Sequence, residues 1–163
     1  MITLYHGSNI NIVKIDLAQC NPYKDFGQAF YLTEDVEQAH DLALARVDIF
    51  GGEPVVNAFT FQEKLLRDGT LAFRSFDGYT EEWADFIYRH RDESFVPPYM
   101  HDYDVVYGPI ANDRVGLQIR FLRQGHIDRA EFLRRLQFMK GITFQYAFCT
   151  QRAIETLMPH ECQ

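Results

Sequence analysis

The chain has 163 residues, of which 47% are hydrophobic and 15% aromatic, and its formal net charge is -7. This length suits one domain with its own hydrophobic core, so we expect residues 1–163 to form a single domain. The acidic balance argues against strong binding of free nucleic acid, because phosphate binding requires clustered Lys and Arg.

The first half of the chain is predicted to contain short strands and one long helix. The ranges 2–5 and 29–32 are apolar and predict buried strands, joined by an irregular connection over 9–25. Thr33 is predicted to cap a helix that the glycines at 51–52 end. Further strands are predicted over 55–61 and 70–76.

In the second half, Thr80 is predicted to cap a helix with one apolar face, which carries Trp83, Phe86, Ile87 and His90. The remaining predicted elements are a strand over 104–107, a helix over 113–122, a helix over 128–139 that begins with a capping box of Asp128 and Glu131, a strand over 142–149, and a helix from Thr150 that Pro159 ends. Residues 117–122 could also form a strand, and the helix is the favoured interpretation. Strands and helices do not alternate regularly. This favours an α+β fold with largely antiparallel sheets over a parallel, doubly wound sheet.

Cysteine content and the lack of targeting or membrane-spanning patterns suggest the compartment. Three cysteines without metal-ligand or CxxC spacing suggest a reducing environment: Cys20, Cys149 and Cys162. The N-terminus has no secretion-signal pattern and no apolar run reaches membrane-spanning length, so we expect a cytoplasmic protein without membrane contact. The densest basic cluster alternates with apolar residues and is interpreted as a solvated helix face: Arg120, Arg123, Arg129, Arg134, Arg135 and Lys140.

Several common site motifs are absent from the sequence. It contains no GxGxxG, no P-loop and no GxSxG, which argues against dinucleotide oxidoreductases, phosphate-cradling NTPases and α/β hydrolases. Its six histidines show no HxxxH or HExxH spacing, so we expect no metal site.

Two short segments carry the strongest indication of function: Leu-Tyr-His-Gly-Ser at 4–8 and Asp-Phe-Gly-Gln-Ala-Phe-Tyr-Leu-Thr at 25–33. His6 beside Gly7 places a hydrogen-bonding ring next to backbone that a ligand can approach closely. Tyr31 offers a flat face to a planar ring, and its hydroxyl needs a partner. Together they suggest a cleft for a nucleotide-like molecule. The alternatives are a core histidine satisfied by backbone and an ordinary strand aromatic.

With Gln-Tyr-Ala-Phe at 145–148, these motifs resemble the ADP-ribosyltransferase superfamily of the diphtheria-toxin and poly(ADP-ribose) polymerase type. That family carries a His-Tyr-Glu triad on three strands. The stretch 104–113 is similar to a small bacterial branch encoded beside short antitoxin-like partners. The resemblance implies two packed, mostly antiparallel sheets with flanking helices, and NAD as co-substrate.

The resemblance also implies a role for each matching residue. His6 would bond a ribose hydroxyl of NAD, the backbone of Gly7 would pair with the nicotinamide amide, and Ser8 would add a contact. Tyr31 would stack on the nicotinamide ring. Gln145 stands where the family has glutamate; its carbonyl accepts the same bond without a full charge, and charge-assisted bonds are roughly twice as strong. The alternative for Gln145 is an edge-strand residue without a role.

Two further positions are relevant to the site. Leu42 stands where relatives have a second aromatic residue, eleven residues after Tyr31, and would give an apolar floor without stacking; Trp83 or Tyr23 are candidate substitutes. Arg114 is a candidate contact to the pyrophosphate or the target. Its neighbours Asn112 and Asp113 are interpreted as an Asx-type turn that caps the next helix.

The sequence therefore predicts a mono-ADP-ribosyltransferase, a glycosyltransferase that moves ADP-ribose from NAD to a macromolecular acceptor and releases nicotinamide. The bacterial resemblance suggests the toxin of a toxin-antitoxin or defence pair, with a small antitoxin protein as partner. The alternatives are a non-catalytic module of the same fold that binds NAD, ADP-ribose or a protein, and an NAD glycohydrolase.

Overall fold

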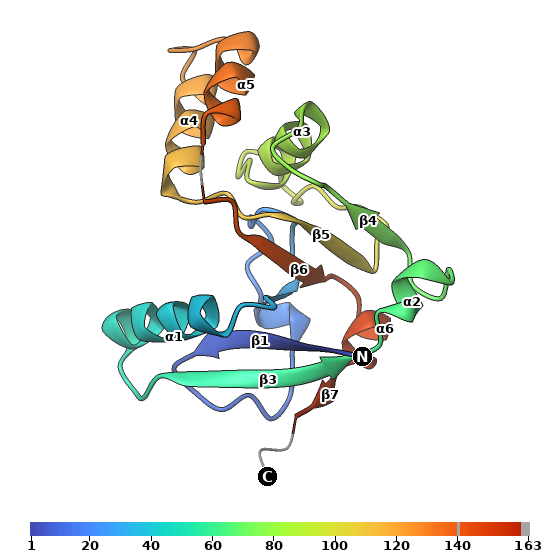
Figure 1. The fold of residues 1–163 in the computed structure, drawn as a ribbon. Helices are drawn as coiled ribbons and strands as arrows, with labels where there is room; N and C mark the ends of the chain where they lie inside the picture. The colour runs from blue at the N-terminus through green and yellow to red at the C-terminus, as the bar shows by residue number, and fades with distance from the viewer. Residues whose placement is uncertain (140, 161–163) are drawn as a thin grey trace.

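The computed structural model describes residues 1–139 and 141–160, which form two sheets and flanking helices (Figure 1). One sheet has three antiparallel strands in the order β1 (Ile2–Ser8), β3 (Val55–Phe61) and β7 (Met158–Pro159). The other has four strands in the order β2 (Phe30–Leu32), β6 (Phe144–Phe148), β5 (Val105–Pro109) and β4 (Phe73–Ser75). Within the four-stranded sheet, only the neighbours β4 and β5 run parallel. The predicted α+β class with mostly antiparallel sheets is confirmed.

The helices are α1 (Val36–Phe50), α2 (Lys64–Arg67), α3 (Glu81–His90), α4 (Asp113–Arg123), α5 (Arg129–Gln137) and α6 (Gln151–Ile154), with a 3-10 turn at Leu17–Gln19. In Figure 1, α1 lies along the three-stranded sheet, whereas α4 and α5 stand together as a hairpin on the side of the four-stranded sheet. Helix α1 thus covers the three-stranded sheet, and α3, α4 and α5 cover the outer face of the four-stranded sheet.

Several predicted helix starts are confirmed by their side-chain caps. Thr80 accepts a hydrogen bond from the N–H of Trp83 at 3.2 Å, and Asn112 accepts one from Val115 at 3.1 Å. The predicted cap of α1 is wrong: the cap is Asp35, whose carboxylate accepts from the N–H groups of residues 37 and 38. Thr33 instead continues the strand and exchanges two backbone hydrogen bonds with Tyr5.

Other predicted bounds also differ. The strand expected over 70–76 is shorter because the chain enters it through α2 and a turn. The helix after Asp128 ends at Gln137 instead of residue 139. The last helix ends at Ile154, and Met158 and Pro159 then add an edge strand to β3. Proline is compatible with an edge strand because no ladder partner is needed for its nitrogen there.

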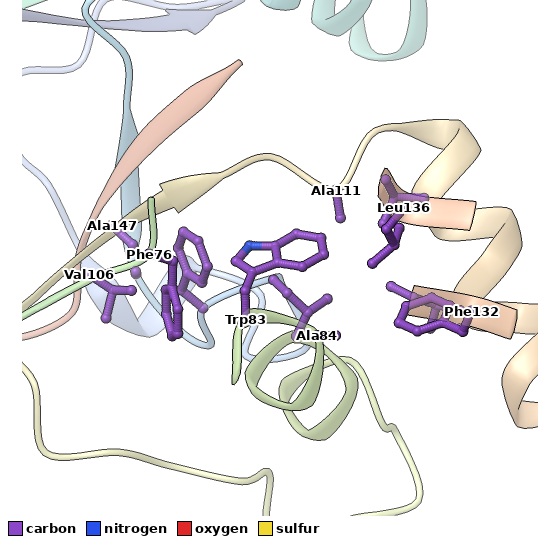
Figure 2. Packing of buried hydrophobic residues seen from close by; sticks show 13 residues of the cluster. Phe76, Trp83, Ala84, Val106, Ala111, Phe132, Leu136 and Ala147 are labelled. Carbon is purple, nitrogen blue, oxygen red and sulfur yellow. The ribbon is translucent and has the colours of Figure 1, made fainter. Parts of the chain in front are cut away.

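Two hydrophobic clusters hold these layers together. The first lies between the sheets and includes Leu4, Phe30, Phe59, Val105 and Phe148. The second joins the outer face of the four-stranded sheet to α3, α4 and α5. Figure 2 shows the Trp83 indole between Phe76, on the sheet side, and Leu136, on the hairpin side. Its Nε1–H donates to the backbone carbonyl of Pro109 at 3.0 Å.

The remaining charge and cysteine predictions have these outcomes. Within the basic cluster, Arg129 pairs with acids of α3, and Arg134 and Arg135 pair with Glu131; Lys140 lies outside the described residues. Cys20 and Cys149 are free thiols, and Cys162 lies outside the described residues. Across 1–139 and 141–160, no helix has the length and apolar character needed to cross a membrane, and no group of side chains suits a metal ion.

Candidate active site

His6 lies on β1, where one hydrogen bond and one stacked aromatic ring fix its side chain. Its Nδ1 is 2.8 Å from the backbone carbonyl oxygen of Tyr31, and its ring stacks on Phe30 with centroids 4.5 Å apart. Burial lowers the pKa of His6 below its ordinary value, and the charge of Arg46 adds to this. A carbonyl only accepts, so the neutral ring carries its hydrogen on Nδ1. Its Nε2 is then an acceptor, and it bonds none of the described residues.

Gly7 directs its backbone polar groups away from β3. Tyr5 exchanges both of its backbone bonds with Thr33, so its N–H and C=O point away from β3. Strand residues two apart point their backbone groups the same way, and Gly7 therefore also directs them toward the β2 side. In the residues that the structure describes, nothing bonds them there. They form a free donor and acceptor pair.

Strands β1 and β2 diverge beyond a single bridge. They are bridged at Tyr5 and Thr33 and form no continuous ladder beyond it. The next antiparallel pair would be Gly7 and Tyr31, but the Tyr31 carbonyl bonds the His6 ring instead. The two predicted motifs thus meet at a split between the two sheets.

Glycine at position 7 also has a packing role. A Cβ there would lie 1.9 Å from the carbonyl oxygen of Ala39 and 2.7 Å from the nitrogen of Ala43, both in α1. Contacts of this kind with backbone cannot be relieved by a rotamer change. Helix α1 can therefore lie directly on the strand that carries His6.

The Tyr31 hydroxyl is committed to the turn that precedes β2. It donates to the carbonyl oxygen of Gly27 at 2.8 Å and accepts from the N–H of Phe26 at 3.0 Å. Burial raises the pKa of Tyr31 well above its ordinary value, and the charge of Asp25 adds to this. The hydroxyl fixes the ring in place and is not free to transfer a proton. The ring stacks on Phe26, with centroids 6.4 Å apart, and packs against the cluster on the outer face of the four-stranded sheet.

Gln145 lies on the same face of the four-stranded sheet as Tyr31. Tyr31 is opposite Ala147, and Gln145 is two residues further along that strand, opposite Gly108. Its Nε2 donates to Oδ2 of Asp25 at 3.3 Å. The three predicted catalytic residues are therefore joined through one network: His6 to the Tyr31 backbone, Tyr31 to the 26–27 turn, and that turn's Asp25 to Gln145.

Asp25 is the member of this network to which sequence reasoning gave no role. The residue is 5% exposed, and its carboxylate accepts from the Arg91 Nε at 2.7 Å and from the Ala111 N–H at 2.9 Å. An acidic residue directly before an apolar Phe-Gly segment was a signal in the sequence, since buried carboxylates are rare unless paired. Its partners lie 66 to 120 positions away, which no local pattern reveals.

The other predicted site residues lie outside this network. Ser8 is buried, and its hydroxyl accepts from the Ile10 N–H at 3.4 Å, in a turn. Leu42 is on α1 and 46% exposed, and Arg114 is exposed on α4. Of the two candidate substitutes for an aromatic at 42, Trp83 is fully buried in the core.

A hollow of about 230 Å³ opens on the face of β6 opposite the Gln145 side chain. It is lined by aromatic rings and by carboxylates at the start of α1. The Tyr146 hydroxyl donates to Glu34 at 2.9 Å there, and Tyr107 stacks on Phe144. Burial and the Glu34 bond raise the pKa of Tyr146. This hollow adjoins the strand that carries Gln145 but faces away from its side chain.

Comparison with known protein families gives a match over most of the chain. The family described as "Protein of unknown function (DUF3990)" matches residues 2–158, which includes every residue of the network above. No curated protein and no solved structure matches the chain. The chain therefore belongs to the DUF3990 family of proteins of unknown function.

Proposed function

We propose that this protein is an NAD-dependent mono-ADP-ribosyltransferase with an ADP-ribosyltransferase-like fold. The observation that carries the proposal is the split between β1 and β2, where the neutral His6 ring, the free backbone pair of Gly7 and the backbone of Tyr31 meet. These groups offer the hydrogen-bond donors and acceptors that the nicotinamide riboside end of NAD would require. The resemblance of both motifs to that superfamily supports the same assignment.

Each group would hold a different part of NAD. A primary amide both donates and accepts, and so does the backbone of Gly7 on the open side of β1. The Nε2 of His6 accepts, as a ribose hydroxyl requires. Tyr31 would offer its ring to the nicotinamide, held in position by its bonds to the 26–27 turn. When bound, NAD supplies an activated glycosidic bond to nicotinamide.

The residues would act by positioning and by charge. As the bond between the ribose C1′ and the nicotinamide nitrogen breaks, its electron pair leaves with nicotinamide and positive charge develops on the ribose. A target nucleophile then bonds C1′ and loses its proton. Gln145 would accept from a ribose hydroxyl and place its carbonyl dipole toward that charge, which is electrostatic stabilisation without a covalent enzyme intermediate.

Two alternatives share this site. The neutral amide of Gln145, in place of a carboxylate, favours a non-catalytic module that binds NAD, ADP-ribose or a protein. An NAD glycohydrolase would use the same groups with water as the acceptor.

One experiment separates the three. Purified protein is incubated with adenine-labelled NAD and a bacterial lysate, and both free nicotinamide and label on macromolecules are followed. Transfer of label supports the proposal, nicotinamide without label supports the glycohydrolase, and NAD binding with neither supports the module. His6→Ala should abolish the signal, whereas His40→Ala, an exposed histidine on α1, is the matched control.

The bacterial resemblance of 104–113 extends the proposal to a cytoplasmic toxin with a macromolecular acceptor and a small antitoxin partner. Induced expression in a bacterium should then arrest growth, and His6→Ala should relieve the arrest. Normal growth with the wild-type protein at the same expression level would contradict the toxin role and leave the transferase proposal to the label assay.

A further inference from the structure

The buried carboxylate of Asp25 has an arrangement that neither the fold nor the motif explains fully. Its Oδ1 accepts from Arg91, and its Oδ2 accepts both from the backbone of Ala111 and from the side chain of Gln145. The first two bonds join the 25–27 turn to α3 and to the end of β5 and satisfy the charge. The third reaches into the candidate active site.

This third bond fixes which way the Gln145 amide faces. A carboxylate oxygen only accepts, so the group that faces Asp25 must be the NH2 of the amide. The carbonyl Oε1 is then directed away from Asp25, and none of the described residues donates to it. Without such a partner, an amide presents either end, and half of its orientations offer a donor where an acceptor is needed.

We propose that Asp25 is a positioning residue that holds Gln145 as a hydrogen-bond acceptor for the ribose hydroxyl. This inference rests on the proposed function for the reaction, but the contact itself does not. The negative charge of Asp25 also lies next to the amide and polarises its carbonyl. The pair of Asp25 and Gln145 thus takes the place of the single glutamate in the family that the sequence resembles.

Gln145 is therefore not interchangeable with glutamate in this chain. A carboxylate at position 145 would stand within hydrogen-bond distance of the Asp25 carboxylate, and like charges so close cannot both stay ionised without a cost. Exchanging the two groups restores one carboxylate and one amide. The charge then stands at 145, as in the resembling family.

The experiment compares wild type with Asp25→Asn, Gln145→Glu and the exchanged double variant, with Asp48→Asn as control. Asp48 is an exposed acid on α1. Nicotinamide release from NAD gives kcat and KM, and thermal unfolding gives the melting temperature. We expect each single variant to lower kcat about 10-fold or more, with a KM change of less than about 3-fold, and the double variant to recover most of the loss.

Wild-type kcat in Asp25→Asn, a gain of activity in Gln145→Glu alone, or a double variant no better than the singles would overturn the proposal. Gln145→Glu leaves the Asp25 contacts to Arg91 and Ala111 in place. This variant therefore still tests the contact between Asp25 and Gln145 if Asp25→Asn fails to fold. If the wild type releases no nicotinamide, the proposed function fails, and the contact is judged by unfolding. Gln145→Glu should then lower the melting temperature by about 5 °C in the wild-type background and by much less beside Asp25→Asn. If Gln145→Glu lowers the melting temperature equally in the wild type and beside Asp25→Asn, the proposed contact between Asp25 and Gln145 is contradicted as well.

Discussion

Nδ1 of His6 lies 2.8 Å from the backbone carbonyl oxygen of Tyr31, although the two residues are 25 positions apart. The bond sets the tautomer of the imidazole and occupies the carbonyl that would otherwise pair β2 with β1. It thereby both prepares His6 as an acceptor and keeps the two strands apart at Gly7. The motifs at 4–8 and 25–33 are thus joined by this hydrogen bond in one local structure.

His6→Phe is expected to lower kcat/KM for NAD by about 10-fold or more, because the ring remains to stack on Phe30 while both nitrogens are lost. Steady-state nicotinamide release measures this. Since burial lowers the pKa of His6 below 6.5, the acceptor Nε2 persists at pH 6.5, and the acid limb of kcat/KM should lie below that pH. A midpoint at or above pH 6.5 would contradict this assignment.

Tyr31→Phe should separate the fold from ligand binding. The variant leaves the buried Phe26 N–H and Gly27 carbonyl without their partner, which should cost about 1–3 kcal/mol in the free energy of unfolding. The ring face is retained, so KM for NAD should stay near the wild-type value. Urea unfolding and kinetics test the two parts. A large rise in KM with unchanged stability would mean that the hydroxyl, instead of the ring, contacts the ligand.

Gly7→Ala should destabilise the protein by about 1–3 kcal/mol, because its Cβ meets the α1 backbone and the helix must move. Gly78→Ala is the matched control, since no atom lies within 4 Å of an added Cβ there and its φ is not positive. Chemical unfolding of both variants measures the difference. Equal stabilities would show that α1 does not press on the strand.

Stability should also fall on acidification because of His90. This side chain is 1% exposed, its Nε2 has no partner among the described residues, and burial lowers its pKa to about 4. In the unfolded chain the ordinary pKa is 6.5, so its contribution is fully present above pH 6.5 and is lost as the pH falls toward 4. The loss amounts to roughly 3 kcal/mol.

Urea unfolding at pH 7 and pH 5 tests this, with His90→Phe as the comparison. The variant should show a smaller loss of stability between the two pH values than the wild type. The half-buried His6 and His101 also have lowered pKa values, so the variant should keep some dependence on pH. An identical pH dependence in both proteins would exclude His90 as a contributor.

Local signals predicted much of the fold. The strand over 55–61 and the helices that begin after Thr80 and Asn112 were found because alternation and caps act within a few residues. The start of α1 was misplaced by two residues because Thr33 and Asp35 are both good caps, and pairing of Thr33 with Tyr5 decides between them. The edge strand at 158–159 depends on β3, almost 100 residues earlier, and has no local signal.

The same division applies to the site. The assignment of His6, Gly7 and Tyr31 to a site is a prediction that rests on the His-Gly pair at a strand end, on the Gly-led context of Tyr31 and on the resemblance of both motifs to a known family. Asp25 was given no role, since its meaning comes from Gln145, 120 positions later, and from the face on which the two strands present their side chains. Pairing of distant strands sets that relationship, and composition or periodicity does not encode it.

The central claim is that the split beside Gly7 takes the nicotinamide end of NAD and breaks its glycosidic bond. The most direct test is nicotinamide release from NAD, measured side by side for the wild type and Tyr31→Ala at equal concentrations of folded protein. We predict steady release by the wild type and a loss of about 100-fold in the variant. Equal release by both proteins, or none by the wild type, would contradict the claim.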